Sequence, residues 1–313
     1  MNRKNGMSHE KKRRYLFVFG MLILPLTQFA IFYVCLNFNS VLMAFQVGRK
    51  MDWSSGFPMY TDEILYGWGN FRAIITDQNG ILSESLVNTL KYFALNLLIL
   101  LPGSLFISFF LFKKILGYKF FRIVFFLPSI ISAIIYVTGF TETIGMYGPI
   151  YEIIEKTGGK WRNWLIYPET ATNTILFYSF WTGFGINMLL FQSAMSRIPA
   201  EILESGCIDG AGWIREMFVL AMPMIWPTIS MTVLLAFTGI FTGGSIVLLF
   251  VTQGGESAGI STISYWIFNK TQKESSGLLG DAAAAGLFFT VISMPLILAV
   301  RWLLNKIDPG VEY

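Results

Sequence analysis

Six long apolar runs constrain the fold of this chain more than any other feature of its sequence. A helix needs about 20 mostly apolar residues to cross the hydrocarbon core of a bilayer. In lipid the backbone must satisfy its own hydrogen bonds, so runs of this length are expected to be helices. The predicted spans are 16–37, 86–112, 120–142, 171–193, 224–250 and 283–304. The sequence therefore predicts an all-α integral membrane protein with six transmembrane helices.

Charged residues are scarce in this chain. Of its 313 residues, 13% are charged and 54% are hydrophobic, whereas about a quarter of an average soluble domain is charged. Because a charge in hydrocarbon is costly, this depletion favours a protein in contact with membrane lipid. The net charge of +4 does not indicate a nucleic-acid partner, because much of the basic charge lies beside the apolar runs, where it orients spans.

Basic residues at the ends of the runs predict the orientation of the spans. They precede span one, lie between spans two and three and between spans four and five, and follow span six. With six spans, all four clusters fall on one side. Cytoplasmic loops carry an excess of Lys and Arg, so we expect a multi-pass protein of the cell (inner or cytoplasmic) membrane with both termini in the cytoplasm. The residues are Arg3, Lys4, Lys11, Lys12, Arg13, Arg14, Lys113, Lys114, Lys119, Arg122, Arg197, Arg215, Arg301 and Lys306.

This topology predicts how the chain is divided. Residues 1–15 form a basic cytoplasmic tail, and residues 16–313 form the transmembrane domain. The first apolar run is too long for the core of a signal peptide and lacks a clean cleavage site, so it is expected to stay in place. Within the domain, residues 38–85 form a long outer loop and residues 196–223 a cytoplasmic hairpin, called here the 196–223 hairpin.

Cofactor and redox chemistry have no clear basis in the sequence. Cys35 and Cys207 are the only cysteines, and the predicted topology separates them by much of the bilayer, so a disulfide between them is not expected. The single histidine, His9, lies in the basic tail, and no metal site is predicted. No G-x-x-x-x-G-K-[ST] segment is present, so the chain is not expected to bind ATP through a P-loop. The "GGKW" segment at 158–161 lacks that spacing.

The spans hold few ionisable groups. Lys91 lies near one end of span two and Glu142 near the outer end of span three. No buried series of Asp, Glu and His is present to relay protons, which argues against a proton-coupled carrier. Sodium coupling stays open, because backbone carbonyls can bind that ion.

The 196–223 hairpin is polar and broken by glycines, although it lies between two membrane-length runs. Its sequence from 201 is "EILESGCIDGAGWIREMFVLAMP". Pro199 suits the first turn of a helix, and Glu201 and Glu204 then lie near the positive end of that helix, where acids are favoured. Gly210 can adopt the left-handed conformation that ends a helix. A second helix starting at Trp213 leads into span five. By shape alone, this is either a connector lying on the inner leaflet or a docking element.

The spacing within the hairpin resembles the signature EAA---G---------I-LP. That signature marks the cytoplasmic loop of permease subunits from binding-protein-dependent ABC importers. Here "ESG" at 204–206 is followed by Gly210 and then by "LAMP" at 220–223. The departures from the signature keep the size class of the signature residue at each position; they are Ser205, Gly206, Leu220 and Met222.

The likeness extends over most of the chain and points to the carbohydrate branch, typified by the maltose and glycerol-3-phosphate permeases. It implies the type I ABC importer permease architecture. The matching segments are "FRIVFFLPSIIS" (121–132), "MYGPIYEII", "NWLIYPETA", "FWTGFG" (180–185), "VTQGG" (251–255) and "GDAAAAGLFFTVI" (280–292).

For the hairpin, the resemblance implies docking onto a cytoplasmic ATPase. ATP and Mg would be bound by two separate ABC ATPase subunits, and this chain would not be an enzyme. A second homologous permease subunit and an extracytoplasmic solute-binding protein would complete the assembly. Glu204 is the expected polar contact with the ATPase; its other reading is a solvated acid that favours the helix dipole by about 0.3–1 kcal/mol. The expected coupling residues are Glu201, Glu204, Ser205, Gly206, Asp209, Gly210 and Ala211.

For the substrate path, the resemblance implies positions in spans four and five. They are Ser179, Thr182, Gly183, Ile186, Phe237, Phe241 and Gly244, and composition adds Trp181, Thr238 and Thr242. Aromatic faces and hydroxyls suit sugar rings, but small residues and Phe also serve helix packing in membranes. For any one residue, packing is at least an equal explanation.

Three functions stay open at this point. The first is an ABC importer permease for a sugar or oligosaccharide. The second keeps ABC import and changes the solute, for example to a glycerophosphodiester or a polyol. The third is a membrane scaffold or receptor that binds a cytoplasmic partner through the hairpin and transports nothing.

Overall fold

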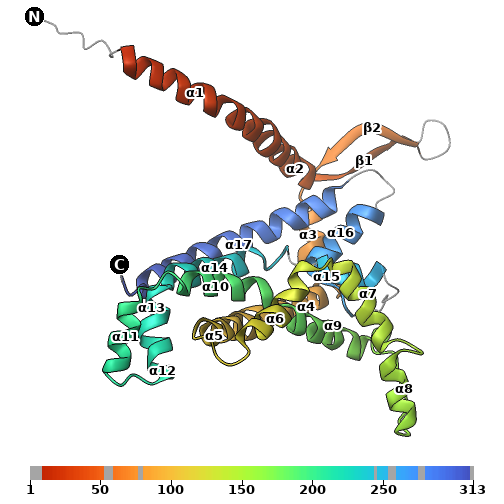
Figure 1. The fold of residues 1–313 in the computed structure, drawn as a ribbon. Helices are drawn as coiled ribbons and strands as arrows, with labels where there is room; N and C mark the ends of the chain where they lie inside the picture. The colour runs from red at the N-terminus through yellow and green to blue at the C-terminus, as the bar shows by residue number, and fades with distance from the viewer. Residues whose placement is uncertain are drawn as a thin grey trace, which may run out of the picture. The chain divides into compact units, whose positions relative to one another are not determined.

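The computed structural model describes residues 9–52, 59–76, 80–242, 245–252, 259–273 and 279–310. The chain divides into two compact units (Figure 1). One contains Met1–Thr76 with Lys270–Phe288, and the other contains Asp77–Asn269 with Phe289–Tyr313. Each is described by itself.

The first unit begins with one long apolar helix. Its segments are α1 His9–Phe29, η1 Ala30–Cys35 and α2 Leu36–Ala44. The apolar side chains on this helix are largely exposed, as expected of a helix that contacts lipid. The helix passes the predicted end of span one at residue 37 and continues to Ala44, so the outer loop predicted from residue 38 starts inside a helix.

The rest of the predicted outer loop is partly folded. An antiparallel hairpin pairs β1 Gln46–Asp52 with β2 Met59–Tyr66, and α3 Gly69–Thr76 follows. The buried Asn70 amide donates hydrogen bonds to the carbonyls of Ala44, at 3.1 Å, and Gln46, at 2.9 Å. The all-α fold class is confirmed, with this two-stranded sheet as a local addition.

The second unit begins with an unbroken helix of residues 81–112, called here the cavity helix. It comprises α4 Ile81–Ala94, η2 Leu95–Leu100 and α5 Leu101–Phe112. The serines of α5 let α10 Gly185–Met195 approach closely, and Ser108 Oγ donates to the carbonyl of Met188 at 2.8 Å. Small hydroxyl residues commonly serve such contacts between membrane helices.

Two predicted spans are not continuous helices. Span three is divided into α6 Tyr118–Ile130 and α7 Ala133–Ile144, which α8 Pro149–Lys156 follows. The chain bends by 101° between residues 118–130 and residues 133–156. Pro128 has no N–H to donate, and Ile131 and Ser132 have extended ψ angles of 144° and 130°, which explains the break.

Span five is divided as well. The chain bends by 77° at Ile225, between the helical segment 213–224 and α14 Trp226–Thr238. The prolines at 223 and 227 each remove a backbone donor near this bend. After α14, a turn at 239–242 precedes α15 Ser245–Thr252. The single span predicted at 224–250 is therefore wrong in its continuity.

The remaining helices complete the second unit. They are α9 Pro168–Thr182, α11 Ala200–Ile208, α12 Trp213–Arg215, η3 Glu216–Ala221, α13 Met222–Met224, α16 Ile263–Lys273 and α17 Gly280–Ile307; the last two also contribute to the first unit. Among the described residues, four helices are long and apolar enough to cross a membrane, and the number is six when each bent pair counts as one span. The predicted six-span architecture is confirmed on that count.

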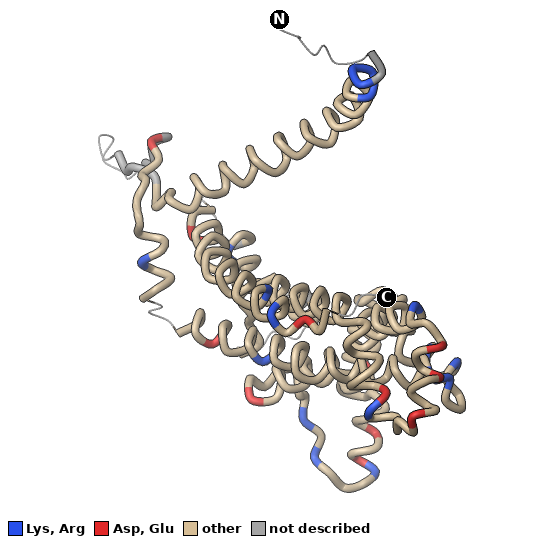
Figure 2. The backbone as a smooth tube through the Cα atoms, turned by 90° about the vertical axis from the view of Figure 1, so that its left-hand side faces the viewer, with Lys and Arg blue, Asp and Glu red and all other residues tan. Residues whose placement is uncertain are grey.

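The segments that carry three of the predicted basic clusters lie together at one end of the second unit. Lys113, after α5, forms an ion pair with Glu216 of the hairpin. The indole of Trp226 donates to the carbonyl of Leu304, near the end of α17, at 3.4 Å. Charged residues gather beside the C-terminus (Figure 2), while α8 lies at the opposite end of the unit (Figure 1).

Candidate functional site

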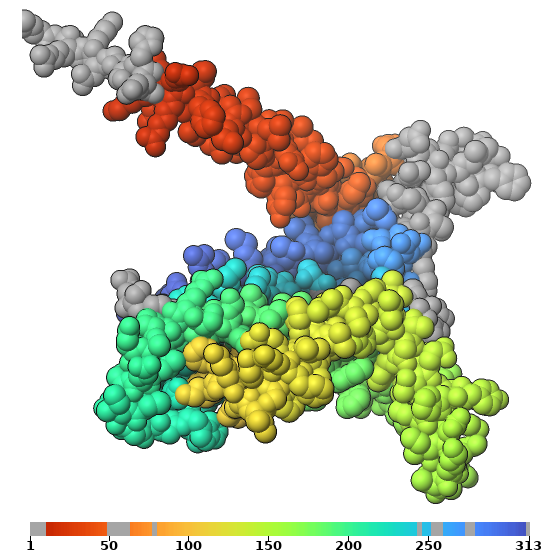
Figure 3. Space-filling model, in the orientation of Figure 1, coloured from red at the N-terminus to blue at the C-terminus, as the bar shows by residue number. Residues whose placement is uncertain are grey.

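The 196–223 hairpin projects from the end of the second unit. The helices α11 and α12 protrude beyond the packed spans (Figures 1 and 3). A tight turn joins them, in which Ala211 N donates to the carbonyl of Gly206 at 2.9 Å and Gly210 N donates to that of Cys207 at 3.1 Å. Gly210 has φ +72°, a left-handed conformation that costs little only for glycine. The sequence prediction of this turn is confirmed.

The exposed surface of α11 carries four polar side chains, beside the exposed Ile208. Glu201, Glu204, Ser205 and Asp209 are all exposed, and Glu201 lies in the first turn, where the helix dipole favours an acid. The role of these four side chains in docking stays a prediction.

Gly206 and Ala211 are small residues of the hairpin that differ in burial. Gly206 is buried, and a Cβ at this position would lie 2.5 Å from Leu220 Cδ1 on the returning helix. Ala211 is half-buried in the turn. Glycine at 206 therefore lets the two arms of the hairpin pack closely.

Apolar and aromatic contacts fix the base of the hairpin to the spans. Met217 and Ala221 are buried in one core cluster with Leu101 and Phe109 of the cavity helix. The Trp213 ring lies 5.5 Å from the ring of Phe110, between centroids. The hairpin is thus exposed at its tip and firmly packed at its base.

A partly buried ion pair at this base was not predicted. Lys113 Nζ lies 2.8 Å and 2.9 Å from the two carboxylate oxygens of Glu216. The Glu216 side chain is 4% exposed and that of Lys113 is 36% exposed. The sequence analysis used Lys113 only to orient the spans, because the residues are far apart in the sequence and no periodic pattern connects them.

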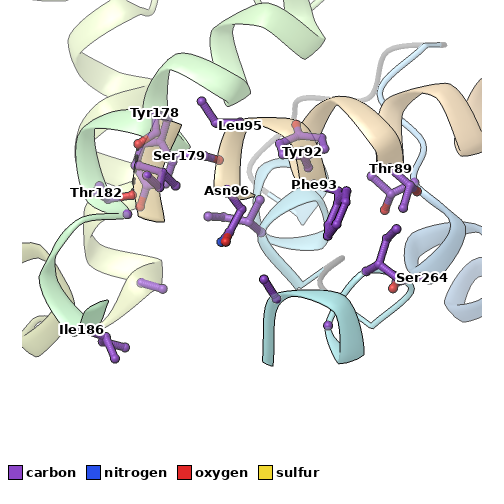
Figure 4. A pocket seen from close by; sticks show the side chains of 18 of the residues that line it. Thr89, Tyr92, Phe93, Leu95, Asn96, Tyr178, Ser179, Thr182, Ile186 and Ser264 are labelled. Atoms are coloured by element: carbon purple, nitrogen blue, oxygen red, sulfur yellow. Dashed lines mark hydrogen bonds between the residues drawn. The ribbon is translucent and has the colours of Figure 1, made fainter. Parts of the chain in front are cut away.

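A cavity of about 490 Å³ lies among the spans of the second unit. The cavity helix and α9 supply facing side chains, with Asn96 and Phe93 on one helix and Ser179 and Thr182 on the other (Figure 4). Other contributions come from α6, α14, α15 and the segment that leads into α16. The full lining is Thr89, Tyr92, Phe93, Leu95, Asn96, Leu100, Pro128, Ser129, Ala133, Tyr178, Ser179, Thr182, Gly183, Ile186, Leu235, Ala236, Gly239, Ile240, Ile246, Thr262 and Ser264.

Hydroxyl groups of this lining are oriented by their own helices. Ser179 Oγ donates to the carbonyl of Ile175 at 2.9 Å, and Thr182 Oγ1 donates to that of Tyr178 at 3.0 Å. The hydroxyl proton of each side chain is engaged by a backbone carbonyl, but the oxygen keeps lone pairs that can accept a hydrogen bond from a ligand. A ligand rich in hydroxyl donors can bind such a wall, and the ring faces of the aromatic residues suit the apolar face of a sugar.

The predicted path residues separate into two groups. Ser179, Thr182, Gly183 and Ile186 line the cavity. Gly183 also permits close packing, because a Cβ there would lie 2.6 Å from Leu100 Cδ1.

The other predicted path residues do not line this cavity. Phe237 packs on Phe93 with 4.8 Å between ring centroids, and Phe241 packs on Phe289 at the same distance. Trp181 contacts Tyr136. Thr238 and Thr242 are exposed and donate to backbone carbonyls of their own chain segment. Gly244 lies outside the described residues. In this conformation the packing explanation fits these side chains.

The sequence analysis missed the contribution of the cavity helix. Thr89, Tyr92, Phe93 and Asn96 all line the cavity. Their spacing of three, four and seven residues places them on one helix face, and Thr89 and Asn96 are polar residues within an apolar run. Polar residues on one face of an apolar helix were the sequence signal that could have identified this wall of the cavity.

A short strap, residues 259–262, contributes Thr262 to the cavity lining. Asn88 Nδ2 donates to the carbonyls of Gly259, at 2.6 Å, and Ser261, at 3.1 Å. Thr172 Oγ1 donates to the Gly259 carbonyl at 2.8 Å, and the Ser85 and Ser261 hydroxyls are 2.9 Å apart. Thr262 lines the cavity, whereas Gly259 lines a separate polar hollow with Asn88 and Thr172. The strap therefore separates the two spaces.

Metal and disulfide chemistry play no visible part in the described residues. No group of three or more His, Cys, Asp or Glu side chains in that part of the chain could hold a metal ion. Cys35 and Cys207 are both free and exposed.

Known proteins of similar sequence are transport permeases. The probable ABC transporter permease protein YurN of Bacillus subtilis (strain 168) is 25% identical over 285 residues, which is 89% of this chain and 92% of that protein. The arabinooligosaccharides transport system permease protein AraP of the same organism is 27% identical over 51% of each chain. The sn-glycerol-3-phosphate transport system permease protein UgpA of Escherichia coli O157:H7 is 26% identical over 75% of this chain and 77% of that protein.

Solved structures share the fold. A chain of a bacterial ABC transporter involved in the import of the acidic polysaccharide alginate superposes with a TM-score of 0.78 at 20% identity, over 95% of this chain and 98% of that one. A chain of the bacterial alginate ABC transporter in complex with an alginate pentasaccharide-bound periplasmic protein gives 0.76 at 20% identity, over 96% and 98%.

The family match covers most of the chain. Residues 101–313 match the family described as binding-protein-dependent transport system inner membrane component. The matched region contains the 196–223 hairpin and much of the cavity lining. This chain belongs to that family of ABC transporter permeases.

Proposed function

We propose that this chain forms half of the translocation path of an ATP-driven importer for a sugar or oligosaccharide. The observation that carries the proposal is the 196–223 hairpin. It projects an exposed tip away from the spans, while its base packs on the helix that lines the cavity. A connector lying on a membrane needs no such attachment to a cavity wall.

The solute is proposed from the cavity and from the relatives. Hydroxyl, amide and aromatic side chains line a space of about 490 Å³, which is in the usual range for small-molecule sites. Relatives named for arabinooligosaccharides and for multiple sugars favour a carbohydrate. The relative named for sn-glycerol-3-phosphate keeps a glycerophosphodiester or polyol as the alternative solute.

The motor and the partners are proposed from the family. Two cytoplasmic ABC ATPases would bind ATP and Mg, and one of them would dock on the exposed face of α11, near Glu204. A second homologous permease subunit would complete the path, and an extracytoplasmic binding protein would deliver the solute. The basic clusters at the hairpin end support a cytoplasmic location of both termini.

Reconstitution tests this proposal. The chain, its partner permease and their ATPases would be placed in liposomes with ATP inside and the purified binding protein outside. Uptake of a labelled sugar that needs both ATP and the binding protein is the expected result. A ligand screen on the binding protein separates sugars from glycerophosphodiesters and polyols. Absence of ATP-dependent uptake of every ligand that the binding protein retains would contradict the transport function and favour a scaffold.

A further inference from the structure

Lys113 and Glu216 join two parts of the molecule that have different roles in transport. Lys113 follows the last turn of α5, and its backbone N–H donates to the Phe109 carbonyl at 3.0 Å. A cation is favoured at this end of a helix. Glu216 begins the returning arm of the hairpin, where its N–H donates to the Gly212 carbonyl at 3.0 Å. The ion pair therefore connects the end of the cavity helix to the hairpin.

The geometry of the pair resists separation. The ammonium contacts both oxygens of the carboxylate, at 2.8 Å and 2.9 Å. With 4% of its side chain exposed, the carboxylate would be left in a poorly solvated place if the lysine withdrew. Leaving one charge of a buried pair without its partner is strongly unfavourable. A displacement of the hairpin should consequently carry the end of α5 with it.

The cavity helix continues without a break from this ion pair to the cavity. It runs from Ile81 to Phe112, and its side chains Thr89, Phe93 and Asn96 line the cavity. The covalent route from the hairpin is less direct, because the chain bends by 77° at Ile225 before α14. A continuous helix transmits a displacement better than a bent connection does.

We propose that the Lys113–Glu216 ion pair is a positioning element that transmits movement of the hairpin to the cavity wall through the cavity helix. The inference rests on the proposed function and adds to it a second connection besides the chain itself. Neither residue is assigned a contact with the solute or the ATPase. Loss of the pair should weaken the connection between ATP hydrolysis and transport while leaving the ATPase docked.

The test compares four variants of the reconstituted transporter. Lys113→Gln and Glu216→Gln each remove one charge, Lys113→Arg keeps the pair, and Lys113→Glu with Glu216→Lys reverses it. Each is measured for retained ATPase, for hydrolysis rate and for solute moved per ATP. Lys114→Gln is the matched control, because this adjacent lysine is not a member of the pair.

The single charge removals should lower the solute moved per ATP by about two- to thirtyfold, the usual range for mutations that weaken coupling between sites. Lys113→Arg and Lys114→Gln should stay near the unmodified value, and the reversed pair should recover much of the loss. Unchanged transport per ATP in both single variants would overturn the proposal. The proposal would also be overturned if Lys113→Arg and the reversed pair, with their ATPase retained, lost as much transport per ATP as the single charge removals. Absence of ATPase from the unmodified chain would instead contradict the proposed function.

Discussion

Glu204 is the residue whose exposed side chain bears most directly on docking. Its carboxylate faces solvent on α11, so substitution removes no intramolecular packing. We predict that Glu204→Lys leaves the chain inserted in the membrane and lowers transport by at least about tenfold, since a hydrogen bond to a charged group contributes about 1.5–3 kcal/mol. The measurement is binding-protein-dependent uptake together with ATPase activity. Glu155→Lys, on exposed α8, is the charge-matched control, and normal coupled transport by Glu204→Lys would remove this residue from the docking surface.

Gly210 determines the turn of the hairpin through its backbone and not through contacts. A Cβ at this position would meet nothing within 4 Å, but φ is +72°. Gly210→Ala should destabilise the turn by about 1–2 kcal/mol, the cost of a left-handed conformation for an L-residue. Gly212→Ala is a matched control, because Gly212 has φ −66° and equally open space. Equal loss of ATPase binding and of Tm in the two variants would contradict the backbone explanation.

At the scale of elements, the strap at 259–262 is the part whose movement can be stopped chemically. The Ser85 and Ser261 hydroxyl oxygens are 2.9 Å apart, so cysteine sulfurs at these positions would start close to the S–S bond length of about 2.05 Å. In a background with Cys35 and Cys207 replaced by serine, we predict that oxidised Ser85→Cys with Ser261→Cys stops transport and that reductant restores it.

The single-cysteine variants are the controls for that experiment, because they undergo the same oxidation without forming the bridge. Full cross-linking with an unchanged transport rate would show that the strap does not separate from the cavity helix during transport.

Element boundaries show where sequence reasoning succeeded and where it could not. The hairpin was predictable because Gly210 and the prolines are local signals with local consequences. The bends at Ile131 and Ile225 were not, since an apolar run has the same composition whether its helix is continuous or broken. Pro128 and Pro227 marked the places, but proline also occurs inside the continuous α17, at Pro295.

The candidate site depended on contacts between distant segments. Ser179 and Thr182 were predicted from one run, whereas Thr89 and Asn96 lie on another, and only packing brings the two helices together. The Lys113–Glu216 pair likewise forms only because packing brings two distant segments together. No periodic pattern in the sequence connects those segments, so the pair could not be predicted.

In the molecule as a whole, an exposed hairpin, an ion pair and a cavity form the proposed transmission route. The route requires that the hairpin binds an ATPase. That claim can be tested without knowing the solute, because docking is a property of the cytoplasmic surface alone.

The most direct measurement is co-purification of the chain with its partner proteins, with residues 199–215 intact or replaced by a flexible linker. Replacement of residues 157–163, beyond α8 at the opposite end of the second unit, is the matched control. The account predicts that an ATPase is retained by the intact chain and by the control, and is lost with the hairpin linker. Equal retention by all three proteins, or no ATPase with any of them, would contradict it.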